Sequence, residues 1–485
     1  MPLRHYLRGE LNMRIDFRKI GMGLGPLLFA IINFVPDLTG LDASPRAVLA
    51  VTTWVATWWI TEALPIPATS LLPIFLLPLA GGTDQATATM AYGNPIVFMY
   101  MGGFTIALGI EKWNLHKRIA MTIIALLGTS SSRITMGVGL ATAFLSMWIS
   151  NAATALMMLP IALALIKEIK DNAFLKEDSF QKFAKGLLLT VAYSASIGGL
   201  ATIVGSVPNA TFVAVASNML GQEITFADWF TFGIIVTVIL LVALYIYITK
   251  IKFKVTDEGN ISSEFAREQL KELGPMSTEE KFVLTIFSLT GLLWIFGGFL
   301  PFELSDTTIS MLGATILFVI PNTKGGRLLD WFDMKGLSWG LLLLFGGGLS
   351  LAAAFESSGL TVWFGDILSN LDRFNYLLIL IILTATVLFM TEIMSNTAVS
   401  NMLMPISVGL AAGIGVEPYG IMAVVALASS CAFMLPISTP PNAAVFGANI
   451  LDIEDMMKAG FWMNMVGIIV IVFAVYVLQP IFLSY

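Results

Sequence analysis

The chain has few cysteines, few histidines and few charged residues. Among its 485 residues, Cys431 is the single cysteine, and His5 and His116 are the two histidines. One cysteine excludes an internal disulfide and a multi-cysteine metal site. Two histidines argue against a histidine metal cluster and against a nucleophile–base pair, so we expect no enzyme and no cofactor beyond a coupling ion. No basic stripe is present, which argues against a nucleic-acid partner.

The scarcity of charge predicts an integral membrane protein. Charged residues make up 12% of the chain and hydrophobic residues 57%, whereas soluble proteins are about 25% charged. Apolar runs of about 20 residues predict an all-α polytopic protein of the plasma membrane, with about eleven transmembrane segments in the lipid bilayer. Two further apolar stretches, near 135–166 and 375–412, contain Ser, Asn and Pro, and we expect them to form re-entrant helical hairpins. The basic first 20 residues predict a cytoplasmic N-terminus.

An internal repeat runs through the chain. SNAATALMMLP at 150–160 recurs as SNTAVSNMLMP at 395–405, 245 residues later, and GSVPNA at 205–210 has its counterpart STPPNA at 438–443. An odd number of spans between the copies would invert the second one, which is typical of transporters with a site between two repeats. We therefore expect four parts: an N-terminal arm (1–20), a first repeat (21–249), a cytoplasmic linker (250–281) and a second repeat (282–485).

Each Ser-Asn pair places polar groups in an apolar stretch, at Ser150–Asn151 and Ser395–Asn396. A broken membrane helix offers free N–H groups to a carboxylate, and released carbonyls suit a small cation. Helix packing through Ser and Asn is the alternative, but the recurrence of the pattern favours a binding site. The Pro208-Asn209 and Pro441-Asn442 pairs predict turns inside apolar stretches.

The membrane spans contain no arginine or lysine near their centres. A bound dianion would therefore lack a fixed positive counter-charge, which is expensive in a low-dielectric site. This absence indicates either coupling to sodium or obligatory exchange of one anion for another. Glu392, three residues before Ser395, has no acidic counterpart at Met147, and two readings stay open for it: a proton carrier or a structural partner.

Five ordered motifs run along the chain: WITEALPIPATSLLP (59–73), SNAATALMMLP (150–160), GGLATIVGSVPN (198–209), SNTAVSNMLMP (395–405) and CAFMLPISTPPN (431–442). Together they resemble the divalent anion/sodium symporter family, which transports dicarboxylates. The resemblance implies a homodimer in which each protomer has a scaffold domain and a transport domain that moves as an elevator. The family includes sodium cotransporters and dicarboxylate exchangers.

The resemblance also implies the binding residues. For a sodium symporter, it places metal ligands at Ser146, Ser150, Asn151, Gly199, Thr391, Met394, Asn396 and Ala432. Ala152 departs from the family pattern, which has Thr there. The change removes one hydroxyl from the groups around Ser150 and Asn151 that would bind the first substrate carboxylate, and we call these groups the first carboxylate clamp. The substrate-binding residues would be Ser150, Asn151, Ala152, Gly199, Pro208, Asn209, Ser395, Asn396, Thr397, Pro441 and Asn442.

These patterns together predict a secondary active transporter of C4/C5 dicarboxylates such as succinate, malate, fumarate or α-ketoglutarate. Dicarboxylate exchange is slightly favoured over Na+ symport, because the altered clamp departs from the symporters. The alternatives are an anion channel and a transporter of another anion such as citrate or sulfate. A channel would need a continuous polar pathway, and the sequence offers no ring of basic side chains for one.

Overall fold

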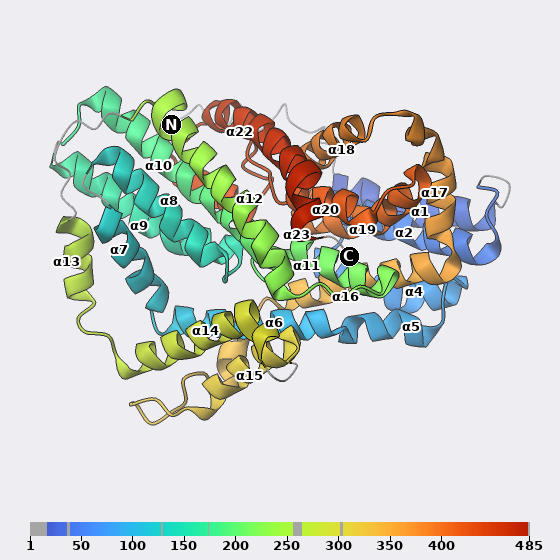
Figure 1. Ribbon diagram of the computed structural model, residues 1–485, viewed down its shortest axis with the longest axis horizontal. Helices are drawn as coiled ribbons and strands as arrows, with labels where there is room; N and C mark the ends of the chain where they lie inside the picture. Colours follow the sequence, from blue (N-terminus) through green and yellow to red (C-terminus); the bar gives the residue numbers. More distant parts are fainter. Residues whose placement is uncertain are drawn as a thin grey trace, which may run out of the picture.

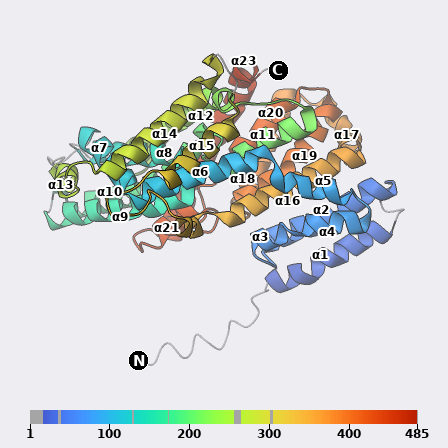
Figure 2. The same cartoon turned by 90° about the horizontal axis from the view of Figure 1, so that it is seen from below.

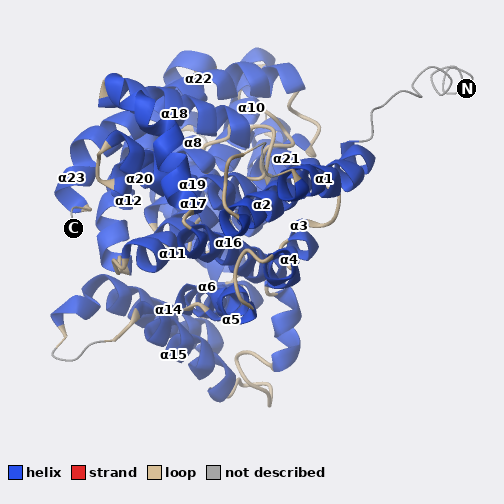
Figure 3. Ribbon diagram, turned by 90° about the vertical axis from the view of Figure 1, so that its right-hand side faces the viewer, coloured by secondary structure: helices blue, strands red, loops and turns tan. Residues whose placement is uncertain are grey.

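The computed structural model describes residues 17–35, 39–127, 130–172, 174–255, 264–300 and 304–483. His5 and most of the basic arm lie outside these ranges. The described residues fold into helices joined by short loops (Figures 1 and 3), and their one β contact is an isolated bridge between Pro321 and Arg327. An all-helical fold is expected in a bilayer, because a helix satisfies its own backbone hydrogen bonds.

Twelve α-helices are described in the first half of the chain, within residues 17–35, 39–127, 130–172 and 174–246. They are α1 (Phe17–Phe34), α2 (Ala43–Thr61), α3 (Ile66–Thr69), α4 (Leu72–Ala80), α5 (Gln85–Met90), α6 (Pro95–Lys112), α7 (Leu115–Leu127), α8 (Ser131–Ser146), α9 (Asn151–Asp171), α10 (Glu177–Gly198), α11 (Val207–Leu220) and α12 (Phe226–Ile246). A π-helical turn, η5 (Tyr247–Lys252), follows α12. In Figure 2, α1 to α4 lie together at one end of the molecule and α7 and α13 at the other.

The second half follows the short helix α13. The helices are α13 (Glu264–Glu272), α14 (Thr278–Phe296), α15 (Asp306–Val319), α16 (Trp339–Ser358), α17 (Leu360–Leu368), α18 (Tyr376–Thr391), α19 (Asn396–Ile414), α20 (Pro418–Ser429), α21 (Pro440–Phe446), α22 (Ile453–Phe473) and α23 (Gln479–Phe482). A second π-helical turn, η9 (Ala474–Leu478), follows α22. Helix α13 lies within the predicted linker and packs against α7.

The helix boundaries repeat with the register of the sequence motifs. Helices α8 and α18 each have 16 residues, and α18 begins and ends 245 residues after α8. Helix α19 likewise begins 245 residues after α9. The π-helical turns η5 and η9 follow α12 and α22 at matching places. The duplication therefore extends from short motifs to whole helices.

Many of the helices are long and apolar enough to cross a membrane. Among the described residues, nine helical segments meet this criterion, and four shorter apolar segments accompany them. The chain is therefore a polytopic membrane protein, as predicted, whereas the number of about eleven spans stays a prediction. Helix α10 is covered by other parts of the chain along most of its length, since 94% of its most apolar stretch is buried, whereas the corresponding stretch of α1 is 11% buried.

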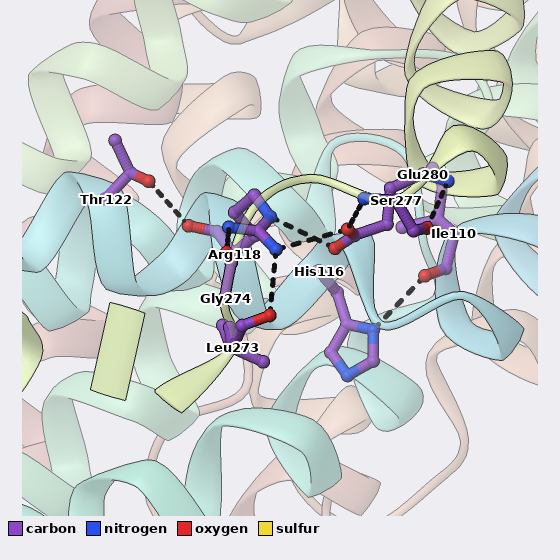
Figure 4. Close-up of polar contacts among 8 residues, drawn as sticks. All are labelled: Ile110, His116, Arg118, Thr122, Leu273, Gly274, Ser277 and Glu280. Carbon is purple, nitrogen blue, oxygen red and sulfur yellow. Dashed lines mark hydrogen bonds and ion pairs between the residues drawn. The ribbon is translucent and has the colours of Figure 1, made fainter. Parts of the chain in front are cut away.

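A buried ion pair joins α7 to α14 (Figure 4). Arg118 Nε donates to Glu280 Oε1 over 3.0 Å, and Arg118 Nη2 donates to Glu280 Oε2 over 3.1 Å. Arg118 Nη1 also donates to the Gly274 carbonyl over 3.0 Å. The two side chains are 14% and 8% exposed. A two-pronged Arg–carboxylate contact is directional as well as strong, so it fixes the position of α7 relative to the start of α14.

Candidate functional site

Two helix breaks carry the Ser-Asn pairs. The first separates α8 from α9 and spans 147–150, and the second separates α18 from α19 and spans 392–395. Ser150 caps α9, because its Oγ accepts a hydrogen bond from Ala153 N over 3.3 Å. Ser395 is the cap residue of α19, but its hydroxyl makes no capping hydrogen bond. The breaks therefore lie where the sequence predicts them.

Each break presents the N-terminus of a long helix. Helix α9 has 21 residues and α19 has 19, so each N-terminus carries a partial positive charge and free N–H groups. Ser150, Asn151, Ser395 and Asn396 are half-buried rather than enclosed, as is Ala152, whereas Thr397 is 8% exposed. Two partly accessible helix N-termini with hydroxyl and amide donors are chemically suited to the two carboxylates of a small dianion.

Oxygen atoms gather behind the first break. Ser146 Oγ lies 2.6 Å from the Ala195 carbonyl and 2.7 Å from the side-chain amide of Asn151. The same amide terminus lies 3.0 Å from the Ala195 carbonyl and 3.2 Å from the Gly205 carbonyl. An amide NH₂ there would lie within hydrogen-bond distance of all three oxygens and could donate to two of them, whereas an amide oxygen would complete a shell that suits a small hard cation. We call this set the first oxygen cluster.

The second break repeats this arrangement. Thr391 Oγ1 lies 2.7 Å from Asn396 Oδ1 and 2.8 Å from the Ser429 carbonyl. A hydroxyl has one hydrogen and cannot donate to both oxygens at once, and three neutral oxygens of this kind are chemically suited to a small hard cation. We call it the second oxygen cluster. In the described part of the chain, His, Cys, Asp and Glu nowhere gather in groups of three or more, so a cation here would rely on neutral oxygens.

The two Pro-Asn pairs hold the loops beside these clusters. Asn209 Nδ2 donates to three carbonyls of its own loop: Gly199 over 3.0 Å, Leu200 over 3.3 Å and Thr202 over 2.8 Å. Asn442 Nδ2 donates to the Ala432 carbonyl over 3.2 Å, to the Leu435 carbonyl over 3.1 Å and to Ser438 Oγ over 3.0 Å. Both amides are fully buried, and their Oδ1 atoms have no hydrogen-bond partner.

The expected turns lie just before the Pro-Asn pairs rather than at them. Pro208 is in the first turn of α11, and Pro441 is in the first turn of α21. Proline suits that position, because the first-turn N–H groups have no partner within the helix and the ring presets the helical φ. The irregular backbone instead spans 199–206 and 430–439.

The two halves of the chain meet at these loops. Ser206 Oγ and Ser430 Oγ share a hydrogen bond of 2.7 Å. Thr211 Oγ1 donates to Asn401 Oδ1 over 2.8 Å. Helix α21 packs on α9, and α11 packs on α19, so each hairpin is covered by a helix of the other half. The structure therefore brings the four motifs into one region, although it places Asn209 and Asn442 as supports of the loops.

Several polar residues of this region were not singled out by the sequence. Thr202, Ser206 and Ser430 each bond to a partner far along the chain or support a loop. The signal that could have found them is the presence of single hydroxyls in otherwise apolar runs. Met394 is half-buried within the second break, and Ala432 is fully buried in the second loop.

Gly199 provides a direct test of the first cluster. A Cβ at this position would lie 2.5 Å from Asn151 Oδ1 and 2.8 Å from the Gly205 carbonyl. On the sequence-based prediction that this cluster holds a coupling sodium ion, Gly199→Ala is expected to raise the sodium concentration that gives half-maximal uptake about tenfold, because the cluster must spread to admit the methyl group. Uptake at graded sodium concentrations measures the effect. Gly23→Ala is the control, since nothing lies within 4 Å of its Cβ, and an unchanged sodium response in Gly199→Ala would contradict the prediction.

The fold and the paired breaks define a polytopic membrane transporter. A sequence profile described as the sodium:sulfate symporter transmembrane region matches residues 24–483, so the chain belongs to that family. The chain is 43% identical over 476 residues to a sodium-dependent dicarboxylate transporter, SdcS, of Staphylococcus saprophyticus, covering 95% of this chain and 91% of the relative. It is 44% identical over 480 residues to SdcS of Staphylococcus aureus, covering 96% and 92%. The resemblance noted from the motifs is thereby confirmed.

Solved structures of more distant transporters share the fold. The YdaH transporter of Alcanivorax borkumensis aligns with a TM-score of 0.58 at 13% identity, covering 89% of this chain and 98% of that one. MtrF of Neisseria gonorrhoeae aligns with a TM-score of 0.57 at 10% identity, covering 96% of each chain. At such low identity the likeness concerns the fold alone.

Proposed function

We propose that this protein is a secondary active transporter that couples the uptake of C4/C5 dicarboxylates, such as succinate, malate, fumarate or α-ketoglutarate, to sodium. The observation that carries the proposal is the pair of half-buried Ser-Asn helix N-termini, each backed by a cluster of neutral oxygens. Helix N-termini attract the substrate carboxylates, and the oxygen clusters suit cations that offset the charge of the dianion. The sodium dependence in the names of the SdcS relatives supports the same pairing.

Sodium symport and dicarboxylate exchange differ in what must be present inside and outside a proteoliposome for uptake to occur. A symporter loads an empty vesicle when sodium is outside, whereas an exchanger needs dicarboxylate inside and ignores sodium. The altered clamp at Ala152 slightly favours exchange, but the names of the relatives now favour symport. Uptake of labelled succinate into proteoliposomes, with and without internal succinate, in sodium or choline buffer, decides between them. No uptake in any of the four conditions would contradict dicarboxylate transport.

The choice of anion is tested in the same vesicles. Unlabelled succinate, malate and α-ketoglutarate are expected to compete with labelled succinate, because each offers two carboxylates to the two helix N-termini. Sulfate and citrate are the informative competitors, and the description of the matched family names sulfate as a transported anion. Stronger competition by sulfate or citrate than by any C4/C5 dicarboxylate would replace the proposed substrate class.

The architecture that goes with this function is also a proposal. The chain would sit in the plasma membrane with its N-terminus in the cytoplasm, as a homodimer in which the hairpins α8–α9 and α18–α19 move with the transport domain as an elevator. The matched helix boundaries of the two repeats support the hairpin assignment. Cross-linking of cysteines placed on α9 and on α14 tests the motion, because the pair should react in one orientation of the transport domain and separate in the other.

Ala152 offers a prediction on affinity. Ala152→Thr adds a hydroxyl in the first turn of α9, beside Asn151, where a substrate carboxylate would bind. One added hydrogen bond of about 1 kcal/mol predicts a KM for succinate about fivefold lower. Ala153→Thr, one residue further along the same helix, is the matched control and is expected to leave KM within about twofold, on the same scale. Equal KM values in the native protein and Ala152→Thr would remove Ala152 from the proposed clamp.

A further inference from the structure

Glu392 is a buried carboxylate inside the second break. Its side chain is 3% exposed, although it directly follows α18 in an apolar environment. A buried carboxylate is costly unless hydrogen bonds or charges compensate it. Such a group in a membrane protein calls for a functional or structural explanation.

Four hydrogen-bond donors surround this carboxylate. Glu392 Oε1 accepts from Phe433 N over 2.8 Å, from Met434 N over 2.9 Å and from Asn464 Nδ2 over 2.7 Å. Glu392 Oε2 accepts from Leu435 N over 3.1 Å. Three consecutive backbone N–H groups and one neutral amide therefore hold the carboxylate, and the loop 430–439 wraps around it. Hydrogen bonds to a charged acceptor are stronger than those to a neutral one.

These bonds also set the direction of the loop carbonyls. In a trans peptide, the N–H of one residue and the C=O of the residue before it point to opposite sides. When Glu392 binds Phe433 N, the Ala432 carbonyl must point away from the carboxylate. Asn442 Nδ2 binds that carbonyl from its other side, over 3.2 Å. Glu392 and Asn442 thus fix the Ala432 oxygen between them.

The second oxygen cluster adjoins this arrangement in the chain. Thr391, whose Oγ1 belongs to the cluster, is the residue directly before Glu392, and Asn396 begins α19 four residues later. Thr391 Oγ1 also lies 2.8 Å from the Ser429 carbonyl, at the start of the loop that Glu392 holds. Glu392 therefore fixes the shape of the loop 430–439, which directly follows the Ser429 carbonyl of the second oxygen cluster.

The first break holds its loop in a different way. The position 245 residues before Glu392 is Met147, which cannot accept from a loop through its side chain. There Thr202 Oγ1 donates to the Met147 carbonyl and accepts from Gly205 N over 2.9 Å. A hydroxyl thus does in the first repeat what the Glu392 side chain does in the second.

We propose that Glu392 is a positioning residue of the second oxygen cluster: it holds the loop that follows Ser429, whose carbonyl belongs to the cluster, and so keeps that carbonyl beside Thr391 Oγ1. The inference rests on the proposed function. The affinity of a cation site depends on the placement of its oxygens, which the surrounding hydrogen bonds fix, so a loop that is held less firmly is expected to weaken sodium binding at the second cluster.

The test uses the purified full-length protein and two sodium readouts. One is the rise in melting temperature when sodium chloride replaces choline chloride, and the other is the sodium concentration for half-maximal succinate uptake into proteoliposomes. Glu392→Gln keeps the side-chain shape but replaces one acceptor oxygen by an NH₂ group, which cannot accept a hydrogen bond from the loop N–H groups. We expect it to raise the half-maximal sodium concentration about tenfold, whereas KM for succinate at saturating sodium stays within about threefold.

A second variant and a control separate positioning from a general loss of stability. Asn464→Leu removes one donor but keeps the carboxylate, and is expected to raise the half-maximal sodium concentration about threefold. Glu279→Gln is the control, because Glu279 is also buried and accepts from Thr323 N over 2.8 Å, but on α14, away from both breaks. It should leave the sodium response unchanged. Should Glu392→Gln fail to fold, Asn464→Leu carries the test.

The outcomes distinguish this inference from the proposed function. A native protein that responds to sodium in neither readout would overturn both. A native protein that responds to sodium, together with variants Glu392→Gln and Asn464→Leu of unchanged sodium response, would overturn the role of Glu392 alone. A parallel shift in Glu279→Gln would show a general stability effect and would overturn it as well.

Discussion

Replacing Asn396 by alanine is expected to lower succinate uptake about 100-fold or more while the protein remains folded. Asn396 begins α19, and its Oδ1 lies 2.7 Å from Thr391 Oγ1 in the second oxygen cluster. The side-chain amide of the same residue lies next to the proposed carboxylate site, whereas the alanine variant keeps the backbone N–H. Losing the neutral contact with Thr391, at about 1 kcal/mol, and a hydrogen bond to a substrate carboxylate, at about 1.5–3 kcal/mol, is sufficient for an effect of this size. Initial rates of uptake into proteoliposomes measure it.

Asn172→Ala is the matched control for this prediction. Asn172 follows the last residue of α9, at the end of the helix that lies farthest from the first break. There its Nδ2 donates to the carbonyl and to the carboxylate of Glu168. Its replacement is expected to leave uptake within about twofold of the native rate, since an exposed hydrogen bond contributes little. Size-exclusion profiles of both variants establish that they are folded. Native-like uptake by Asn396→Ala would show that the second break is not part of the proposed binding site.

Replacing Arg118 by alanine is expected to destabilise the protein by about 3–5 kcal/mol, because Glu280 would be left as a buried, unpaired carboxylate. The Arg118 and Glu280 side chains are 14% and 8% exposed, and Arg118 also holds the Gly274 carbonyl. The loss would separate α7 from the start of α14, which Figure 4 shows side by side. Thermal unfolding of the purified protein in detergent measures the effect as a fall in melting temperature.

An exposed ion pair on the same protein calibrates this result. Lys182 and Asp178 pair at 2.5 Å on α10, with side chains 47% and 82% exposed. Lys182→Ala is expected to cost at most about 1 kcal/mol, since water screens surface charges. If Arg118→Ala and Lys182→Ala melt at the same temperature, the Arg118–Glu280 contact does not fix α7 to α14.

The sequence predicted the helix breaks because their signal is local. Ser and Asn in an apolar run are costly unless the helix is interrupted, so Ser150 and Ser395 marked the ends of α8 and α18 within a few residues. The matched motifs also predicted the register of the two halves. The prediction of a turn at Pro208 was wrong, because it treated proline only as a residue that interrupts a helix. Proline is also common in the first turn of a helix, where Pro208 lies in α11.

The support of the loops could not be predicted, because it depends on contacts between distant residues. Glu392 meets loop residues about 40 positions later and Asn464 on α22. Of the two readings that the sequence left open, the four donors favour a structural partner. The division into scaffold and transport domains, the homodimer and the binding roles of individual residues stay predictions, since they concern motion, partners and ligands.

The hydrogen bond between Ser206 and Ser430 links events at the two breaks. Each serine belongs to a loop that lies beside one oxygen cluster, so neither loop can shift without straining the other. Linkage of this kind is reciprocal: whatever free energy an ion at one cluster contributes to order at the second, an ion at the second contributes to the first. On the proposed function, sodium ions at the two clusters are therefore expected to bind cooperatively.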